Sequence, residues 1–279
     1  MLIFASKSHM NLLGVDVGFS KERKTTGLAW RIGGAFGVGR TGTSWEIRKR
    51  QVPHVPYSVA AFDAPIIPQH EGCPYRECER LFYGGPFWNR CRPGLSHREK
   101  RGLPLRQAGA DAASQFVALV SGSPIATEIA VRAGTGIIEA FPNAFLGVLI
   151  PDESYKNSDR REGEHKSDWM YRKVAEQGTL KKLLSKLDWT GHDTVKVFAE
   201  QAGPHGNHEI RAALVCLMTA GFAASSAAVT VGTPAHGWFW LPPWKFWEHW
   251  AQKALESQLQ RLITERASTI VRWSGPTFR

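Results

Sequence analysis

The stretch LLGVDVGFS, residues 12–20, places the carboxylate of Asp16 inside an apolar run. The pattern recurs where Asp63 interrupts VAAFDAPI and where Glu139 follows two isoleucines in GTGIIEAFP. Burying a carboxylate is costly unless it is paired or binds a cation. Each acid lies toward the end of its run, which indicates that the acids share one site at the ends of buried strands.

The order of the apolar runs predicts an α/β fold, a mixed sheet with helices on its faces. Short turn-prone segments join the first three runs, which favours antiparallel neighbours; the runs are residues 12–19, GLAWRIG, and AFGVGRTG with SWEIRKRQ. The last two stretches form either one strand or a bent pair. The runs SVAAFDAPI and TGIIEAF predict strands buried on both faces. GWFWLP predicts a last short strand or extended segment.

Apolar residues at helical spacing predict the helices. The expected helical segments are RQAGADAASQFVALVSGS, PNAFLGVLI, KSDWMYRKVAEQGTLKKLLSKL, NHEIRAALVCLMTAGFAAS and WKFWEHWAQKALESQLQRLITERA. Asn207 is a suitable N-cap for the fourth of these. Tryptophans 244, 247 and 250 are expected to dock the last helix on the body, with a base-stacking platform as the alternative.

The strands that carry Asp16, Asp63 and Glu139 are expected to be successive neighbours about 4.8 Å apart, with the acids converging at one edge. Converging carboxylates repel one another, and Mg²⁺ or Mn²⁺ with water in the remaining positions offsets that cost. Glu209, in the first turn of its helix, is a fourth candidate ligand. Taken singly, each acid also has a structural interpretation, such as shaping a turn or complementing a helix dipole.

Composition limits the partners. Lys and Arg number 35 against 25 Asp and Glu, a net charge of +10 over 279 residues, which favours nucleic acid. Solvated basic loops are the alternative. The absence of an apolar run of about 18 residues and of a proper signal sequence predicts a cytoplasmic protein without a membrane span. The oligomeric state is not predictable from these features.

The segment between the fourth strand and the next helix is rich in metal-ligating side chains. These are His70, Cys73, Cys78, Cys91 and His97. Their spacing lacks the two close ligand pairs that are typical of zinc sites, so reduced cysteines are the first expectation and structural zinc the alternative. Cys216 lies inside a helical apolar pattern and is expected in the core.

Six motifs occur along the chain in a fixed order: GVDVGFS, AFDAPI, CERLF, IIEAFPNAFL, HEIRAALVCLMTA and GTPAHGWFWLP. The same order is seen in the predicted nucleases of domain of unknown function 429. The chain resembles that family from about residue 12 to 243. The resemblance implies an RNase H-like mixed five-stranded sheet with helices on both faces. A nuclease domain is then expected over 11–243, with insertions at about 67–105 and a polar helical one at 152–200. An amphipathic C-terminal helix is expected over 244–279, packed on the body.

The resemblance also implies which residues act. It places acidic metal ligands at Asp16, Asp63, Glu139 and Glu209. The chain departs from the family pattern at Ala212, where the family often has a second helical Asp. The site's activity is therefore open at this stage.

The leading hypothesis is a Mg²⁺- or Mn²⁺-dependent nuclease that hydrolyses phosphodiester bonds of DNA or RNA by a two-metal-ion mechanism. Arg106, Lys166 and Arg172 are candidate phosphate contacts. One alternative is an ATP-dependent phosphotransferase of the actin and sugar-kinase type, although Pro65 removes an N–H that a phosphate loop would use. The other is a non-catalytic nucleic-acid-binding protein. The choices of DNA or RNA and of endo- or exonuclease are left open.

Overall fold

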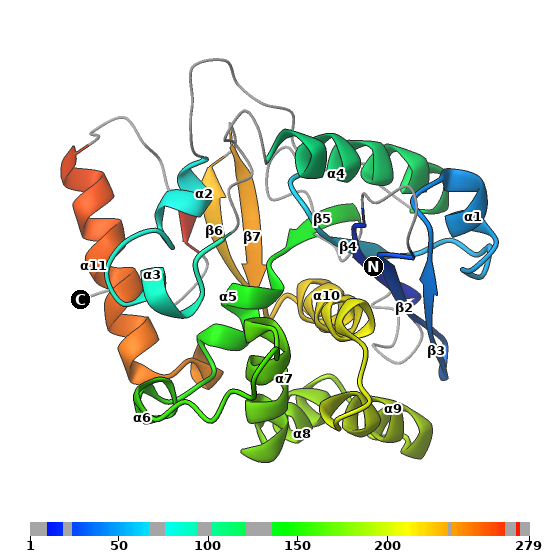
Figure 1. Ribbon diagram of the computed structural model, residues 1–279. Helices are drawn as coiled ribbons and strands as arrows, with labels where there is room; N and C mark the ends of the chain where they lie inside the picture. The colour runs from blue at the N-terminus through cyan, green and yellow to red at the C-terminus, as the bar shows by residue number, and fades with distance from the viewer. Residues whose placement is uncertain are drawn as a thin grey trace, which may run out of the picture.

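The computed structural model describes residues 10–18, 24–66, 76–93, 102–120, 136–233, 236–265 and 272–273, and these contain one mixed sheet (Figure 1). The strands are β1 (Leu12–Asp16), β2 (Thr26–Ile32), β3 (Ala35–Thr41), β4 (Val59–Asp63), β5 (Gly136–Ala140), β6 (Val229–Thr233), β7 (Gly237–Leu241) and the two-residue β8 (Arg272–Trp273). Their order across the sheet is β3-β2-β1-β4-β5-β7-β6-β8.

Helices connect and cover the strands. They are α1 (Trp45–Lys49), α2 (Glu77–Arg80), α3 (Phe87–Arg90), α4 (Leu103–Phe116), α5 (Pro142–Gly147), α6 (Asp152–Lys156), α7 (Lys166–Glu176), α8 (Thr179–Lys186), α9 (His192–Ala202), α10 (His208–Ala224) and α11 (His249–Glu265), with 3-10 turns η2 (Val117–Leu119) and η3 (Trp244–Phe246). None of the described helices is long and apolar enough to span a bilayer.

Strand pairing confirms the mixed sheet. β2 pairs antiparallel with β1 and β3, whereas β1, β4, β5 and β7 run parallel. The five strands expected from residues 12 to 141 are present, but the expected total of five is wrong. β6 and β7 form an antiparallel hairpin that extends the sheet beyond β5. GWFWL, expected as a last strand or extended piece, is β7, and its partner β6 was not anticipated.

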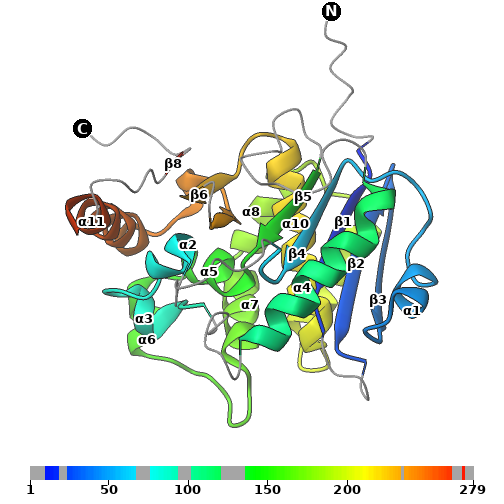
Figure 2. The same ribbon diagram turned by 90° about the horizontal axis from the view of Figure 1, so that it is seen from above.

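The two faces of the sheet have separate cores, and Figure 2 shows α4 on one face and α10 on the other. Alternate residues of each strand point to opposite faces. Leu13, Val15 and Phe62 pack with the α4 side, whereas Val59 and Ala61 pack with the α10 side. The site residues are therefore assigned to a face by their position in this alternation.

Close packing of α10 on the sheet depends on glycine. A Cβ on Gly14 would lie 2.3 Å from the carbonyl oxygen of Ala213, and one on Gly27 would lie 1.9 Å from that of Glu209. Both contacts are with backbone, which cannot rotate away. These glycines let the first turns of α10 rest directly on β1 and β2.

Three expected elements differ in detail. SWEIRKRQ was expected as part of a strand, but residues 45–49 form α1, because Ser44 caps the helix by accepting a hydrogen bond from the Ile47 amide at 3.4 Å. The segment KSDWMYRKVAEQGTLKKLLSKL is helical as expected, but it forms two helices, α7 and α8, divided at Gly178, where φ is +71°. The last helix begins only at His249, after η3.

The tryptophans before and within α11 anchor that helix. The indole N–H of Trp247 donates to the Pro242 carbonyl and that of Trp250 to the Ile150 carbonyl, both at 2.8 Å. Leu255 of the same helix is fully buried. These rings are therefore used in docking α11 rather than as a base-stacking platform, which agrees with the first expectation.

Candidate functional site

Asp16 and Asp63 are neighbours at the carboxyl ends of two central strands, and this end of the parallel strands is called the acidic edge below. They are the last residues of β1 and β4, which are parallel, and they face each other in register. Residues in register on adjacent strands point to the same face, here the face covered by α10. Both residues are half-buried. The structure thus places together the two acids that the sequence had indicated first.

The surroundings of this pair oppose ionisation. The pKa of Asp16 is well above its ordinary value because of burial and the nearby carboxylates of Asp63 and Glu209. Burial and Glu139 raise the pKa of Asp63 to about 7, while His208 acts in the opposite direction. Two carboxyl groups with raised pKa values at the carboxyl ends of parallel strands mark a position where a cation is favoured.

Glu209 reaches this edge from the first turn of α10. Asn207 caps the helix by accepting a hydrogen bond from the Ile210 amide at 3.1 Å, as expected. The Glu209 carboxylate lies 3.4 Å from the Arg40 guanidinium of β3. Its backbone rests on β2, and Ala212, one turn further on, carries no ligand. The helical contribution to the acidic cluster therefore comes from Glu209.

Glu139 does not join the cluster, which corrects the expectation that all the strand acids converge. In register it faces Phe62, not Asp63, so its side chain points to the α4 face. A shift of one residue reverses the face of a strand side chain. There Arg76 donates two hydrogen bonds to the Glu139 carboxylate, each at 2.6 Å, and also pairs with Glu79 at 3.0 Å.

Burial and ion pairing act in opposite directions on the pKa of Glu139. Burial raises the pKa of Glu139, and Arg76 pulls it back down. Arg76 and Glu139 are only 3% and 4% exposed, so each neutralises a charge that would otherwise be very costly to bury. Glu139 is therefore a structural partner of Arg76 in this structure, although its charge is felt by Asp63.

A histidine, an aspartate and an arginine beside the acids were missed from the sequence. His208, next to Glu209, lies 2.9 Å from an Asp168 carboxylate oxygen, and Arg211 lies 3.1 Å from the same oxygen. The hydrogen bond to Asp168 raises the pKa of His208 despite burial. The His208 ring also lies 4.7 Å from that of His165. The dipeptide His-Glu at a helix start was the only local signal for this network, because Asp168 is distant in the chain.

The candidate phosphate contacts are dispersed. Arg106 is buried on α4 and senses the charges of Arg76, Glu79 and Glu139, on the face opposite Asp16. Arg172 is occupied by a set of carboxylates, namely Asp159, Glu164 and Glu176. Lys166 lines a pocket beside α3. Arg106 and Arg172 are therefore not part of the proposed site.

The cysteines give no metal centre in the described part of the chain. Cys78 and Cys91 are buried free thiols, and burial raises the pKa of Cys91 to about 12. Cys216 is buried beneath Asp16 and Asp63, as its core position predicted. Cys73, His70 and His97, the remaining members of the zinc alternative, lie outside the described residues.

Among the described residues, no group of three or more His, Cys, Asp and Glu side chains is placed to hold a metal ion. The acidic edge therefore offers a carboxylate pair with Glu209 nearby, rather than a closed protein cage. Such a pair can share a proton, or can hold a cation that completes its coordination with water and an anionic ligand.

Comparison with known proteins adds no relative. No family model, no curated protein and no solved structure matches the chain. The resemblance to domain of unknown function 429 therefore rests on the motifs quoted above.

Proposed function

We propose that the protein is a Mg²⁺- or Mn²⁺-dependent nuclease with an RNase H-like core. The observation that carries the proposal is the in-register pairing of Asp16 with Asp63 at the carboxyl ends of parallel strands, with Glu209 supplied by α10. The arrangement of β1 to β5, an antiparallel meander followed by parallel strands, supports the core assignment. The two-metal-ion form of the mechanism belongs to the same proposal.

The residues at this edge fit a hard divalent cation. Carboxylate oxygens are the ligands that Mg²⁺ prefers, and it is usually bound by one or two carboxylates together with water and substrate phosphate. Asp16 and Asp63 would hold it, and the Glu209 carboxylate nearby would add negative charge without completing a three-ligand group. When bound, the cation supplies Lewis-acid chemistry, making water more acidic and stabilising the leaving oxygen of a phosphodiester.

The protein's own residues define the rest of the site. The pKa of His208 is raised by Asp168, so the imidazole carries more positive charge near neutral pH and favours an anionic substrate. Arg211 shares Asp168 and fixes that carboxylate. Arg40 is 41% exposed beside Glu209 and adds a second cation at the rim. The net charge of +10 favours a polyanion, so nucleic acid is the substrate class that we propose.

The test is metal binding and cleavage by matched variants. Mn²⁺ titration calorimetry and cleavage of labelled DNA and RNA are compared for the wild-type protein, Asp16→Asn, Asp63→Asn and Asp193→Asn. Asp193 is 97% exposed on α9 and provides the same chemical change away from the site. We expect the first two variants to lose Mn²⁺ binding and cleavage and the control to keep both. Folded variants that bind Mn²⁺ as the wild type does would refute the proposal.

A non-catalytic nucleic-acid-binding protein is the second candidate. It is favoured by the absence of a three-ligand group among the described residues. This candidate predicts that polynucleotide binding survives in Asp16→Asn and Asp63→Asn and that the wild type shows no metal-dependent cleavage. The phosphotransferase alternative predicts a rise in melting temperature with ATP and Mg²⁺, and we expect none.

A further inference from the structure

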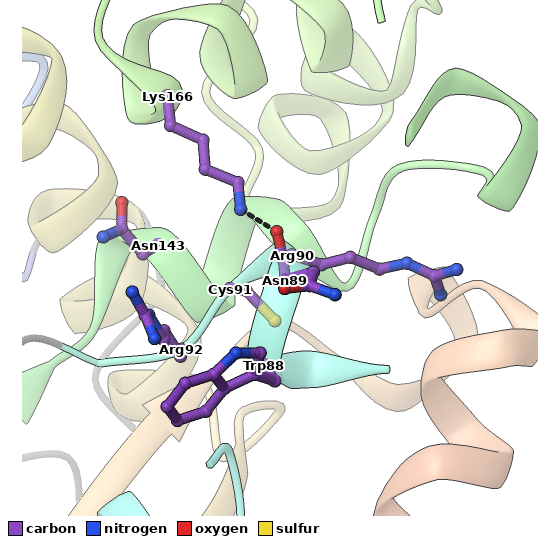
Figure 3. A pocket seen from close by; sticks show the side chains of 7 residues that line it. All are labelled: Trp88, Asn89, Arg90, Cys91, Arg92, Asn143 and Lys166. Carbon is purple, nitrogen blue, oxygen red and sulfur yellow. Dashed lines mark hydrogen bonds between the residues drawn. The ribbon is translucent and has the colours of Figure 1, made fainter. Parts of the chain in front are cut away.

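Three segments line a basic pocket of about 240 Å³. They are α3 with the two residues that follow it, the first turn of α5 and the start of α7. Figure 3 shows Lys166 reaching from α7 and donating a hydrogen bond to the Asn89 carbonyl. Asn143 and Arg92 lie on one side of the pocket, and Trp88 lies opposite Lys166. Its walls are formed by segments that are far apart in the sequence. The pocket was therefore not predictable from any motif.

The pocket carries excess positive charge. In the part of the chain that the structure describes, neither Lys166 nor Arg92 forms an ion pair. Burial lowers the pKa of Lys166, and nearby arginines lower it further. Burial keeps the Cys91 thiol neutral, with a pKa of about 12, so the lining contains no compensating anion.

Aromatic rings hold two of the arginines in place. The Arg92 guanidinium lies 4.3 Å from the Trp88 ring centroid, and that of Arg90 lies 4.1 Å from the ring of Trp250. Arg90 also pairs with Asp152 and extends away from the other cations, as Figure 3 shows. Arg92 is thus oriented at the pocket without being neutralised, and ordering it in advance lowers the entropy cost of binding an anion.

The pocket is connected to the acidic edge of the sheet. Asn143 lies in α5, which starts directly after β5. Lys166 begins α7, and Asp168 in the same turn binds His208, the neighbour of Glu209. The start of α7 therefore contributes to both the pocket and the network beside Asp16 and Asp63.

We propose that this pocket binds a backbone phosphate of a single polynucleotide strand, with Lys166 and Arg92 as its cationic contacts, Asn143 as a hydrogen-bond donor and Trp88, 45% exposed, as a surface for a neighbouring base. The volume is below the roughly 300 Å³ of small-molecule pockets, which suits one phosphate group with its sugar. The choice of a polynucleotide, rather than another phosphate compound, rests on the proposed nuclease function.

The test measures fluorescence anisotropy of labelled 20-mer oligo(dT) and oligo(rU) in EDTA, so that metal-dependent cleavage plays no part. Lys166→Ala and Arg92→Gln are expected to weaken binding roughly tenfold at low salt, and each lowers the slope of log K against log salt by about 0.7. Trp88→Ala is expected to weaken it at least about fivefold. Lys181→Ala, an exposed lysine of α8 with the same loss of charge, is expected to change it less than about twofold.

Each outcome decides the proposal. Variants Lys166→Ala and Arg92→Gln that bind like Lys181→Ala, while circular dichroism shows them folded, would overturn it. If inorganic phosphate or a mononucleotide bound as tightly as the oligonucleotide, the ligand of the pocket would be a small phosphate compound. That result would also overturn the proposal. Weakened binding with no wild-type cleavage in Mn²⁺ would retain the pocket and reject the nuclease. Cleavage by the wild type, together with unaltered oligonucleotide binding in the variants, would retain the nuclease and reject the pocket.

Discussion

Replacing Asp63 with asparagine is expected to stabilise the metal-free protein at neutral and alkaline pH. The pKa of Asp63 is raised from 3.8 to about 7. Because the folded state holds this proton to a higher pH than the unfolded chain does, the contribution of Asp63 to stability is present below pH 4 and is lost as the pH rises to 7. One pKa unit corresponds to about 1.4 kcal/mol, so the full penalty is about 4 kcal/mol.

Asparagine has nearly the same shape and no charge, so Asp63→Asn removes this penalty. Part of the repulsion is shared with Asp16, and we expect a gain of roughly 2–4 kcal/mol at pH 8 and about 1 kcal/mol at pH 4.5. The measurement is urea unfolding in EDTA at the two pH values. Millimolar Mn²⁺ at pH 8 is expected to stabilise the wild type and not the variant.

The control is Asp193→Asn, whose carboxylate is exposed on α9. We expect its free energy of unfolding to follow that of the wild type at both pH values. If Asp63→Asn were no more stable than the wild type at pH 8, or gained equally at pH 4.5, the carboxylate would not be under electrostatic strain. A cation would then have no electrostatic reason to bind between Asp16 and Asp63.

Three further predictions concern the supports of the site. Arg76→Met is expected to destabilise the protein by about 3–5 kcal/mol in denaturant unfolding, because it leaves the buried Glu139 without a partner, and adding Glu139→Gln is expected to restore part of the loss. Gly14→Ala is expected to cost at least about 2 kcal/mol by the same measurement, since its Cβ would overlap the α10 backbone. His208→Asn is expected to remove a stability contribution that is present below pH 6.5 and is lost as the pH rises through the raised folded-state pKa, which melting curves from pH 5 to 8 can check.

Much of the architecture could be predicted from local patterns. The apolar runs determined β1 to β5, helical spacing determined α4 and α10, and Asn207 supplied the cap of α10. These features depend on residues close together in the chain, so propensity and periodicity are sufficient. The pairing of Asp16 with Asp63 could also be predicted, because both acids end their runs and parallel strands end at the same edge.

Long-range packing decided the rest. The sequence shows that Glu139 ends a strand, but only the register with β4 turns its side chain to the α4 face, where Arg76, 63 residues away, pairs with it. The bond between His208 and Asp168 and the basic pocket likewise join segments that share no local pattern. Register, ion pairing and pocket shape follow from the free energy of packing distant segments together, and no stretch of sequence contains that free energy by itself.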